Sequence, residues 1–348
     1  MTVCKAMAAS PTPKPTRRNK TSPADLSALP NGLVALHLQA WARRTSFPET
    51  QKIAVAYSGG ADSTALLHAA AVQWPGQVTA IHVHHGLQAA ADDFVRHCEA
   101  ACIAINVALH VVQVDAKNAS GESPEDAARK ARYAALAGQA IALDIGMIAL
   151  AQHADDQVET LLLALSRGAG VAGMAGMAAE FERFGVRFVR PLLALGAQEI
   201  RDELDARGIA CINDPSNSDL AYTRNKIRHR LLPLLAEVFP QYRKTFARSA
   251  RNMALAQEAL AQAAIELIAV TGSPPNIAAL QGLPRASQGN LLRHWLKTQF
   301  GMAGSEAQLN ELLDQIADCT NRGKGIRIKV AGGFVERHGA ALAYLPSL

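Results

Sequence analysis

The stretch at residues 53–63 constrains the fold of this chain more than any other, and it runs Ile-Ala-Val-Ala-Tyr-Ser-Gly-Gly-Ala-Asp-Ser. Its apolar residues predict a short buried strand, and the glycine pair predicts a tight turn into a helix that begins near Ser63. The first amides of such a helix have no partner within the helix, and the positive end of the helix dipole lies there. The stretch therefore predicts a site for an anion such as a phosphate group.

The residues of this turn indicate which class of phosphate-binding loop it belongs to. Asp62 brings a carboxylate, which either caps the helix or holds a divalent cation. The glycines are adjacent and no Gly-Lys-Ser/Thr follows, which argues against a Walker A loop and against a dinucleotide fingerprint. An ordinary strand-to-helix turn is the alternative. The stretch resembles the pyrophosphate-binding loop of the N-type ATP pyrophosphatases, which cleave ATP between the α and β phosphates. That resemblance implies an ATP-binding set of Ser58, Gly59, Gly60, Ala61, Asp62 and Ser63.

Length and composition favour a soluble chain of about two domains. The chain has 348 residues, of which 49% are hydrophobic, enough for a sizeable core. No unbroken apolar run reaches the ~18 residues of a membrane span. The five cysteines form no Cys-x-x-Cys pair, which favours a reducing compartment. We therefore expect a cytoplasmic protein with no membrane partner, whose oligomeric state stays open, with a homodimer among the alternatives.

The net charge of +5 comes from the beginning of the chain. Residues 1–50 carry seven Lys and Arg against two acids, and the remainder is balanced at 28 of each. Overall charge therefore gives no argument for nucleic-acid binding, and local clusters have to supply one. Residues 1–32, rich in Pro, Thr, Ser and basic residues, predict a disordered basic extension; an organellar transit peptide is the alternative.

Strand and helix patterns alternate after residue 52. Strands are expected at 53–57, 78–83, 109–114 and 147–151, with helices at 63–73, 92–105, 125–143 and 156–166. This alternation predicts an α/β fold, a Rossmann-like parallel sheet with helices on both faces, over a catalytic domain at 33–235. A smaller, mainly helical domain is expected at 236–348. Its helices are predicted at 246–268, 285–299 and 305–318, and short strands at 325–330, 333–336 and 341–345.

Residues 152–160, Gln-His-Ala-Asp-Asp-Gln-Val-Glu-Thr, form a second informative stretch. It follows a strand and opens a helix, so His153 and Asp156 share a helical face. Acids at a helix start are also typical of simple dipole compensation. Beside an ATP crevice, however, Asp156 would bind Mg²⁺ together with Asp62 and spread the charge of the leaving pyrophosphate. The glycine-rich segment at 167–176 is either a substrate lid or a linker.

Two further clusters carry charge or metal-binding groups. His82, His84 and His85 close the second predicted strand, where a border of the nucleotide crevice is favoured over a metal site. Residues 221–251 hold eight Lys and Arg against the single acid Glu237. A long solvated helix normally mixes both signs, so this cluster favours binding to a phosphate backbone.

These motifs together resemble the tRNA(Ile)-lysidine synthases over roughly residues 52–345. Gln152 stands where that family often has a second histidine, and Gln88 replaces a common arginine. The chain also resembles the shorter, two-domain form of the family. The matching elements are the loop at 58–63, His82-Val-His-His-Gly-Leu87, Ala128-Arg129 with Arg132-Tyr133, His153-x-x-Asp156-Gln157-x-Glu159-Thr160, Arg190-Pro-Leu-Leu193, Asp214-Pro-Ser-Asn217 and Tyr222-x-Arg224-Asn225-x-Ile-Arg228.

The resemblance implies a reaction and its participants. The wobble cytidine of tRNA(Ile) is adenylated on O2 by ATP with Mg²⁺, and free L-lysine then attacks C2, which gives lysidine, AMP and pyrophosphate. It also implies the roles of individual residues. Asp62 and Asp156 are expected to be catalytic and to bind the metal, and His153 is the nearest candidate base. The expected tRNA-binding residues are Arg129, Arg224, Asn225 and Arg228.

Overall fold

The computed structural model describes residues 32–48, 50–84, 91–114, 124–320 and 325–346, and the chain forms two compact units. Unit 1 comprises Met1–His153 and Glu180–Pro215, and unit 2 comprises Ala154–Ala179 and Ser216–Leu348. The predicted extension at 1–32 lies outside the described residues apart from Gly32. Each unit is defined by the contacts within it and is made of two separate stretches of the chain. These units therefore do not test the predicted domains at 33–235 and 236–348, which stay predictions.

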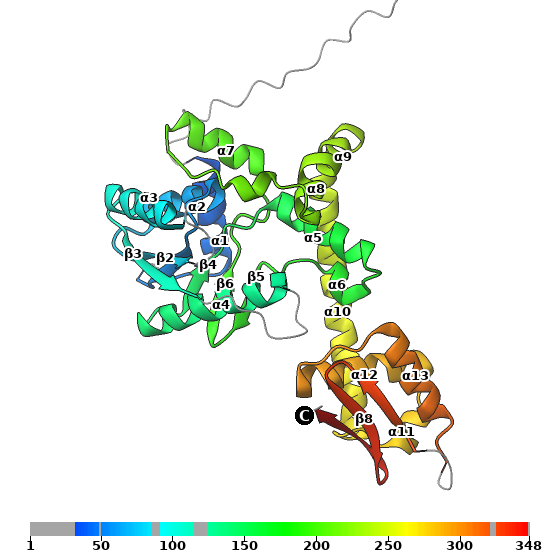
Figure 1. Ribbon diagram of the computed structural model, residues 1–348. Helices are drawn as coiled ribbons and strands as arrows, with labels where there is room; N and C mark the ends of the chain where they lie inside the picture. Colours follow the sequence, from blue (N-terminus) through cyan, green and yellow to red (C-terminus); the bar gives the residue numbers. More distant parts are fainter. Residues whose placement is uncertain (1–31, 49, 85–90, 115–123, 321–324, 347–348) are drawn as a thin grey trace, which may run out of the picture. The chain divides into compact units, whose positions relative to one another are not determined.

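Unit 1 is built on a six-stranded sheet of order β3-β2-β1-β4-β6-β5 (Figure 1). All neighbouring strands are parallel except β5, which runs antiparallel to β6. The predicted α/β class with a parallel sheet is confirmed. The strands are β1 (Ile53–Ala56), β2 (Val78–His84), β3 (Ala108–Gln113), β4 (Met147–Ala149), β5 (Glu180–Arg183) and β6 (Val186–Val189).

The β5–β6 hairpin was not predicted, and its turn explains why. Both turn residues have positive φ, 53° at Phe184 and 74° at Gly185. A two-residue turn of this kind favours Asn, Asp or Gly at its first position, so a phenylalanine there gives no hairpin signal.

Helices cover both faces of this sheet (Figure 1). One face packs on helices α1, α2, α3 and α7, and the other on α4. In β1, Ile53 and Val55 enter the first core and Ala54 enters the second. A strand covered on both sides has to be apolar at successive positions, as β1 is. The helices are α1 (Leu33–Arg44), α2 (Ala61–Gln73), α3 (Ala91–Ala104), α4 (Pro124–Ala142) and α7 (Ala197–Ala206).

Unit 2 contains the long helix α10 (Tyr242–Thr271). Near its first turns a small core of Val158, Ile227, Leu232 and Tyr242 joins helices far apart in the sequence. The shorter elements of this part are α5 (Ala154–Ser166), α6 (Val171–Met174), the 3-10 turn η2 (Pro215–Ser218), α8 (Thr223–Lys226), the π-helical turn η3 (Ile227–Leu231) and α9 (Leu232–Val238).

The last part of unit 2 has its own apolar core around Trp295. Three helices and an antiparallel sheet of order β7-β8-β9 enclose it. Two of these helices and the three strands lie close to the predicted ranges, whereas the short helix at 277–281 was not predicted. The bounds are α11 (Ile277–Gln281), α12 (Arg285–Phe300), α13 (Glu306–Ala317), β7 (Arg327–Val330), β8 (Gly333–His338) and β9 (Ala341–Pro346).

Helix α10 also bears on the predicted absence of a membrane partner. Among the described residues it is the one helix long enough, with 30 residues, and apolar enough, with an 18-residue window of mean hydropathy 1.4, to cross a membrane. The prediction considered unbroken apolar runs, whereas this helix is interrupted by polar residues. A single helix of this kind is weak evidence for a membrane protein, and the cytoplasmic location stays a prediction.

Candidate active site

The loop after β1 is closed by its own hydroxyl groups. The Ser63 Oγ donates to the Gly60 carbonyl at 3.0 Å and lies 3.0 Å from the Ser58 Oγ. The Ser58 amide donates to the same Ser63 oxygen at 3.2 Å. Helix α2 has Gly60 as its N-cap, so no side chain caps its first amides. The predicted anion site is thus supplied by backbone amides and held in shape by two serines.

Gly59 has a conformation and a setting that exclude a side chain. Its φ of 82° lies in the left-handed region, which L-residues other than glycine adopt at a cost. A Cβ on Gly59 would also lie 2.7 Å from the Ile212 Cδ1 and 3.1 Å from the Cys98 Sγ. The first glycine of the predicted pair is therefore required on both counts.

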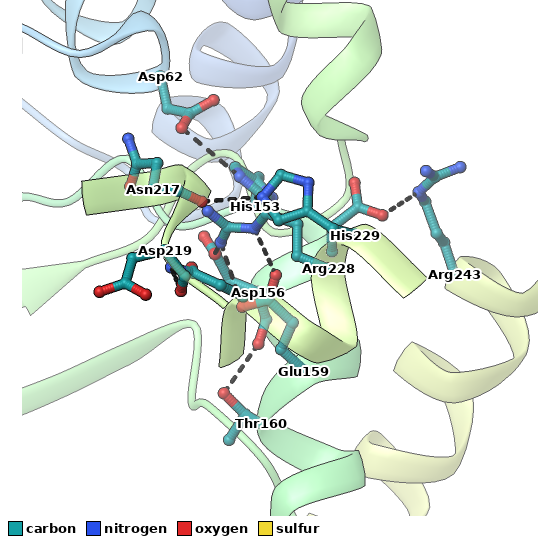
Figure 2. Close-up of polar contacts among 12 residues, drawn as sticks. Asp62, His153, Asp156, Glu159, Thr160, Asn217, Asp219, Arg228, His229 and Arg243 are labelled. Atoms are coloured by element: carbon teal, nitrogen blue, oxygen red, sulfur yellow. Dashed lines mark hydrogen bonds and ion pairs between the residues drawn. The ribbon is translucent and has the colours of Figure 1, made fainter. Parts of the chain in front are cut away.

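Asp62 and His153 meet within unit 1. The His153 Nε2 lies 3.6 Å from the Asp62 Oδ2. Figure 2 shows that the two side chains point toward each other. His153 is buried, whereas the Asp62 side chain is about one-third exposed. The other carboxylate oxygen, Asp62 Oδ1, is buried and has no hydrogen-bond partner among the described residues. An uncompensated buried oxygen of this kind is costly unless a ligand pairs with it.

This arrangement suits a magnesium ion that arrives with a nucleotide. The described residues contain no group of three or more His, Cys, Asp or Glu side chains able to hold a metal alone. Mg²⁺ is usually bound by one or two carboxylates together with substrate phosphates and water, not by a cage of protein groups. The unpaired Asp62 Oδ1 could serve as one of these carboxylate ligands of the ion.

A buried arginine lies at the end of β6. Arg190 donates from Nε to the Gln152 Oε1 at 2.7 Å, and its guanidinium stacks on the Phe181 ring at 4.4 Å. The Arg190 Nη2 lies 3.5 Å from the Tyr133 hydroxyl. Burial alone would raise the pKa of Tyr133, but the charges of Arg190 and Arg129 lower it. Two of the family motifs, those of Arg190 and Tyr133, therefore contact each other here, together with Gln152.

Arg129, a predicted tRNA contact, lies on α4 beside this cluster. Its guanidinium stands 5.8 Å from the centroid of the Tyr133 ring, and its side chain is half-buried. Such a cation can reach a phosphate while its stem packs on the aromatic ring.

His82 supports the strand that carries the loop. Its Nδ1 donates to the Tyr57 carbonyl at 2.9 Å, and the Cys98 Sγ lies 3.7 Å from the same nitrogen. Burial lowers the pKa of His82, so the ring is neutral and structural at physiological pH. His85 lies outside the described residues.

In unit 2, one arginine joins two of the acids on α5 (Figure 2). Arg228 donates from Nε to the Glu159 Oε1 at 2.7 Å and from a second nitrogen to the Glu159 Oε2 at 3.1 Å. The same nitrogen donates to the Asp156 Oδ1 at 3.0 Å. Glu159 is fully buried, and burial raises its pKa although Arg228 opposes the rise. Arg228 thus neutralises carboxylates of its own unit.

The neighbouring acid Asp155 is also satisfied. The Tyr242 hydroxyl donates to its Oδ1 at 2.8 Å, and the Arg243 Nε donates to the same oxygen at 2.7 Å. Burial, helped by the Asp155 carboxylate, raises the pKa of Tyr242. These contacts join the first turn of α5 to the first turn of α10.

The other predicted tRNA residues lie in the same unit. Asn225 is buried and donates from Nδ2 to the Asp219 carbonyl at 2.8 Å, which closes the turn before α8. Arg224 is half-buried, and its charge, like that of Arg228, opposes the burial that raises the pKa of Glu159. The structure therefore brings Arg224, Asn225 and Arg228 together on α8 and η3.

The glycine-rich segment at 167–176 leads into a backbone contact. The Gln157 side chain accepts from the Met177 amide at 2.7 Å and donates to the Met177 carbonyl at 3.2 Å. A Cβ on Gly176 would lie 2.9 Å from the Gln157 Oε1. The segment is thus fixed at its end, and the choice between lid and linker stays open.

Sequence reasoning named the loop, Asp62, His153, Asp156 and the α8–η3 residues, but it missed three sets of contacts. It gave no role to Arg190, although the Arg-Pro-Leu-Leu motif signalled it. Nothing in the local pattern indicated that Asp155 pairs with Tyr242, or that Ile212 contacts Gly59. These contacts join residues distant in the chain, so periodicity and spacing carry no trace of them.

Comparison with known proteins agrees with this description. A family model described as a PP-loop domain matches residues 35–235, and one described as a TilS substrate binding domain matches residues 276–342. A tRNA(Ile)-lysidine synthase of Polaromonas naphthalenivorans is 57% identical over 302 residues, which is 86% of this chain and 92% of the relative. One from Burkholderia pseudomallei is 41% identical over 280 residues, and these cover 78% of this chain and 57% of that protein.

A solved structure shares the fold at low identity. The U34-tRNA thiolase NcsA from Methanococcus maripaludis is 14% identical with a TM-score of 0.55, covering 63% of this chain and 78% of its own. At that identity the likeness concerns the fold alone.

The loop at 58–63 and the sheet that presents it make this chain a PP-loop enzyme, a class that uses ATP. Within that class, the identity to curated relatives decides the family. The chain belongs to the tRNA(Ile)-lysidine synthases.

Proposed function

We propose that this enzyme ligates free L-lysine to C2 of the wobble cytidine of tRNA(Ile), with ATP converted to AMP and pyrophosphate. The observation that carries the proposal is the loop at 58–63, whose helix amides are uncapped and whose Asp62 Oδ1 is unpaired, in a chain of this family. A site of that kind binds nucleotide phosphates together with a divalent cation.

The first chemical step is adenylation of the cytidine. The cytidine O2 attacks the α phosphorus of ATP, the bond to the β phosphate breaks, and pyrophosphate leaves. The amides after Gly60 are the proposed contacts to the phosphates, and the Ser58 and Ser63 hydroxyls hold the loop that presents these amides. Asp62 and Asp156 are the proposed ligands of Mg²⁺, which when bound neutralises charge on the leaving group. The adenylate then makes the C2 oxygen a good leaving group.

The second step is attack by lysine. The ε-amine of lysine bonds to C2, and AMP leaves with the former O2 oxygen. The amine has to be neutral to attack, although its ordinary pKa is about 10.4, so a base has to accept its proton. His153 is the proposed base, because its ring already lies beside the Asp62 carboxylate.

Three arginines and one asparagine are the proposed contacts to the tRNA: Arg129 in unit 1, and Arg224, Asn225 and Arg228 in unit 2. Phosphate contacts of this kind fix the position of the RNA, and the wobble base then leaves its stack to reach the reacting groups. A cytoplasmic location is also proposed, because the five cysteines form no Cys-x-x-Cys pair and no unbroken apolar run is long enough for a membrane span.

Sulfur transfer to tRNA is the rival activity, since NcsA, a thiolase, shares the fold. Burial raises the pKa of Cys98 to about 12 and that of Cys102 to about 11. Thiols with such values carry little of the reactive thiolate at neutral pH. These two cysteines are therefore poor sulfur carriers.

The test is incorporation of labelled lysine into a tRNA(Ile) transcript with a wobble cytidine, with and without ATP. We expect ATP-dependent labelling that disappears when the cytidine is replaced by uridine in an otherwise identical transcript. Pyrophosphate release that depends on another RNA or metabolite, without labelling, would keep the adenylating fold and overturn the substrate.

A further inference from the structure

One contact of the ATP loop comes from a segment that none of the motifs includes. Residues 209–213 follow α7 and precede the Asp-Pro-Ser-Asn turn. Within them, the Ile212 amide donates to the Gly59 carbonyl at 2.8 Å, and Ile212 forms an isolated parallel bridge with Gly60. The glycine turn is thus paired with a strand-like segment of unit 1 from far along the chain.

This pairing fixes the peptide group between the two glycines. The Gly59 carbonyl accepts from the Ile212 amide and also from the Thr64 Oγ1, at 3.2 Å. A carbonyl has two lone pairs, so its capacity is used, and turning it would break both hydrogen bonds. Because the Gly59 carbonyl and the Gly60 amide belong to one planar peptide, the direction of that amide is fixed as well.

The side chain of Ile212 adds a steric constraint. Its Cδ1 lies 2.7 Å from the position that a Cβ on Gly59 would occupy. Ile209, three residues earlier, is half-buried like Ile212 but packs against the apolar core of unit 1. In this segment the Ile212 side chain therefore lies against Gly59 of the ATP loop, whereas the Ile209 side chain packs against the apolar core of unit 1.

We propose that Ile212 is a positioning residue for ATP. Through Gly59 it holds the amides of the loop in the conformation that binds the nucleotide phosphates, without touching a reacting atom. This inference rests on the proposed function, because it assumes that the loop at 58–63 binds ATP.

The experiment compares Ile212→Ala with Ile209→Ala, which removes the same atoms from a matched position. The measurements are the dissociation constant of a non-hydrolysable ATP analogue, the KM values for ATP, lysine and tRNA, and Tm. We expect Ile212→Ala to raise the dissociation constant and the KM for ATP about tenfold by loosening the loop. Its KM values for lysine and tRNA stay unchanged. Ile209→Ala lowers Tm and leaves all three KM values unchanged.

The outcomes separate this inference from the proposed function. Equal ATP affinity in wild type and Ile212→Ala overturns the role of Ile212 alone, and so does an equal rise of all three KM values. A wild-type protein that binds no ATP analogue overturns the proposed function, and the inference with it. If Ile212→Ala does not fold, Ile212→Val removes only Cδ1 and is expected to weaken ATP binding about threefold. Unchanged affinity in that variant also overturns the inference.

Discussion

Two helices of the molecule begin with carboxylates directly after parallel strands, and they use them differently. Helix α2 follows β1 and carries Asp62 in its first turn, and α5 follows β4 and carries Asp155 and Asp156. The Asp62 Oδ1 has no hydrogen-bond partner in the described part of the chain. On α5, by contrast, Asp155 and Asp156 each accept a hydrogen bond from an arginine.

The difference distinguishes a ligand site from a framework. An unsatisfied buried polar atom costs about 1–3 kcal/mol, and Asp62 keeps such an atom where a cation would satisfy it. The α5 acids are already satisfied, and their partners belong to η3 and α10. Asp62 is therefore the better metal ligand of the two proposed, because Asp156 has to share its carboxylate with Arg228.

The largest expected effect tests the ligand side of this comparison. Asp62→Ala should lower the rate of AMP formation about a thousandfold, or about 4 kcal/mol, because it removes the proposed metal ligand. Filter binding should show unchanged tRNA affinity. Asp62→Asn, which keeps the shape and loses the charge, should be equally inactive. Turnover near the wild-type rate in either variant would refute the metal role.

The next effect tests the framework side. Arg228→Ala leaves the fully buried Glu159 without the arginine that donates hydrogen bonds to it. We expect a loss of about 3 kcal/mol in the free energy of unfolding, the low end for a buried ion pair because Arg228 is partly exposed. Urea unfolding measures it. Glu159→Gln in the same background should restore part of the loss, and a double variant no more stable than the single one would contradict the pairing.

The pH dependence of this variant follows from the Glu159 carboxyl. Burial raises its pKa above the ordinary value of 4.5, so the folded protein holds the proton more tightly than the unfolded chain. The protonated group favours the fold below pH 4.5, and that contribution is lost as the pH rises through the folded pKa. Without Arg228 the pKa rises further. The destabilisation of Arg228→Ala should therefore be larger at neutral pH than near pH 4.5.

The comparison also explains how much the sequence alone could predict. The ATP loop is made by consecutive residues, so a strand, two glycines and a helix start were enough to place Asp62 and the serines. The sheet followed from alternating patterns for the same reason. The family resemblance then supplied motifs and roles that spacing does not contain.

The framework contacts could not be predicted in that way. Arg228 and Glu159 are 69 residues apart, and Arg190 and Gln152 are 38 apart. A basic residue in a basic cluster suggests phosphate binding, and only the fold reveals that Arg228 is already engaged by two acids. The tRNA role of Arg228 therefore stays a prediction.

A smaller effect is expected from Arg224, one of the proposed tRNA contacts of unit 2. Arg224→Ala should raise the KM for tRNA about tenfold and reduce the salt dependence of binding by about one ion. The KM for ATP should stay close to the wild-type value. Arg201→Ala, an exposed arginine of α7, is the control and should change neither quantity. Equal tRNA affinity and salt dependence in the two variants would remove Arg224 from the interface.

The smallest expected effect concerns Asp155. Tyr242→Phe removes the hydrogen bond from the Tyr242 hydroxyl to the Asp155 Oδ1 and leaves the one from Arg243. We expect a loss of about 1 kcal/mol in the free energy of unfolding, with the KM for ATP and the rate of AMP formation unchanged. Tyr222→Phe, at an exposed tyrosine before α8, should change none of these. A fall in rate without a fall in stability would place Asp155 in the chemistry, and the acids of α5 could then no longer be separated from Asp62 as a framework.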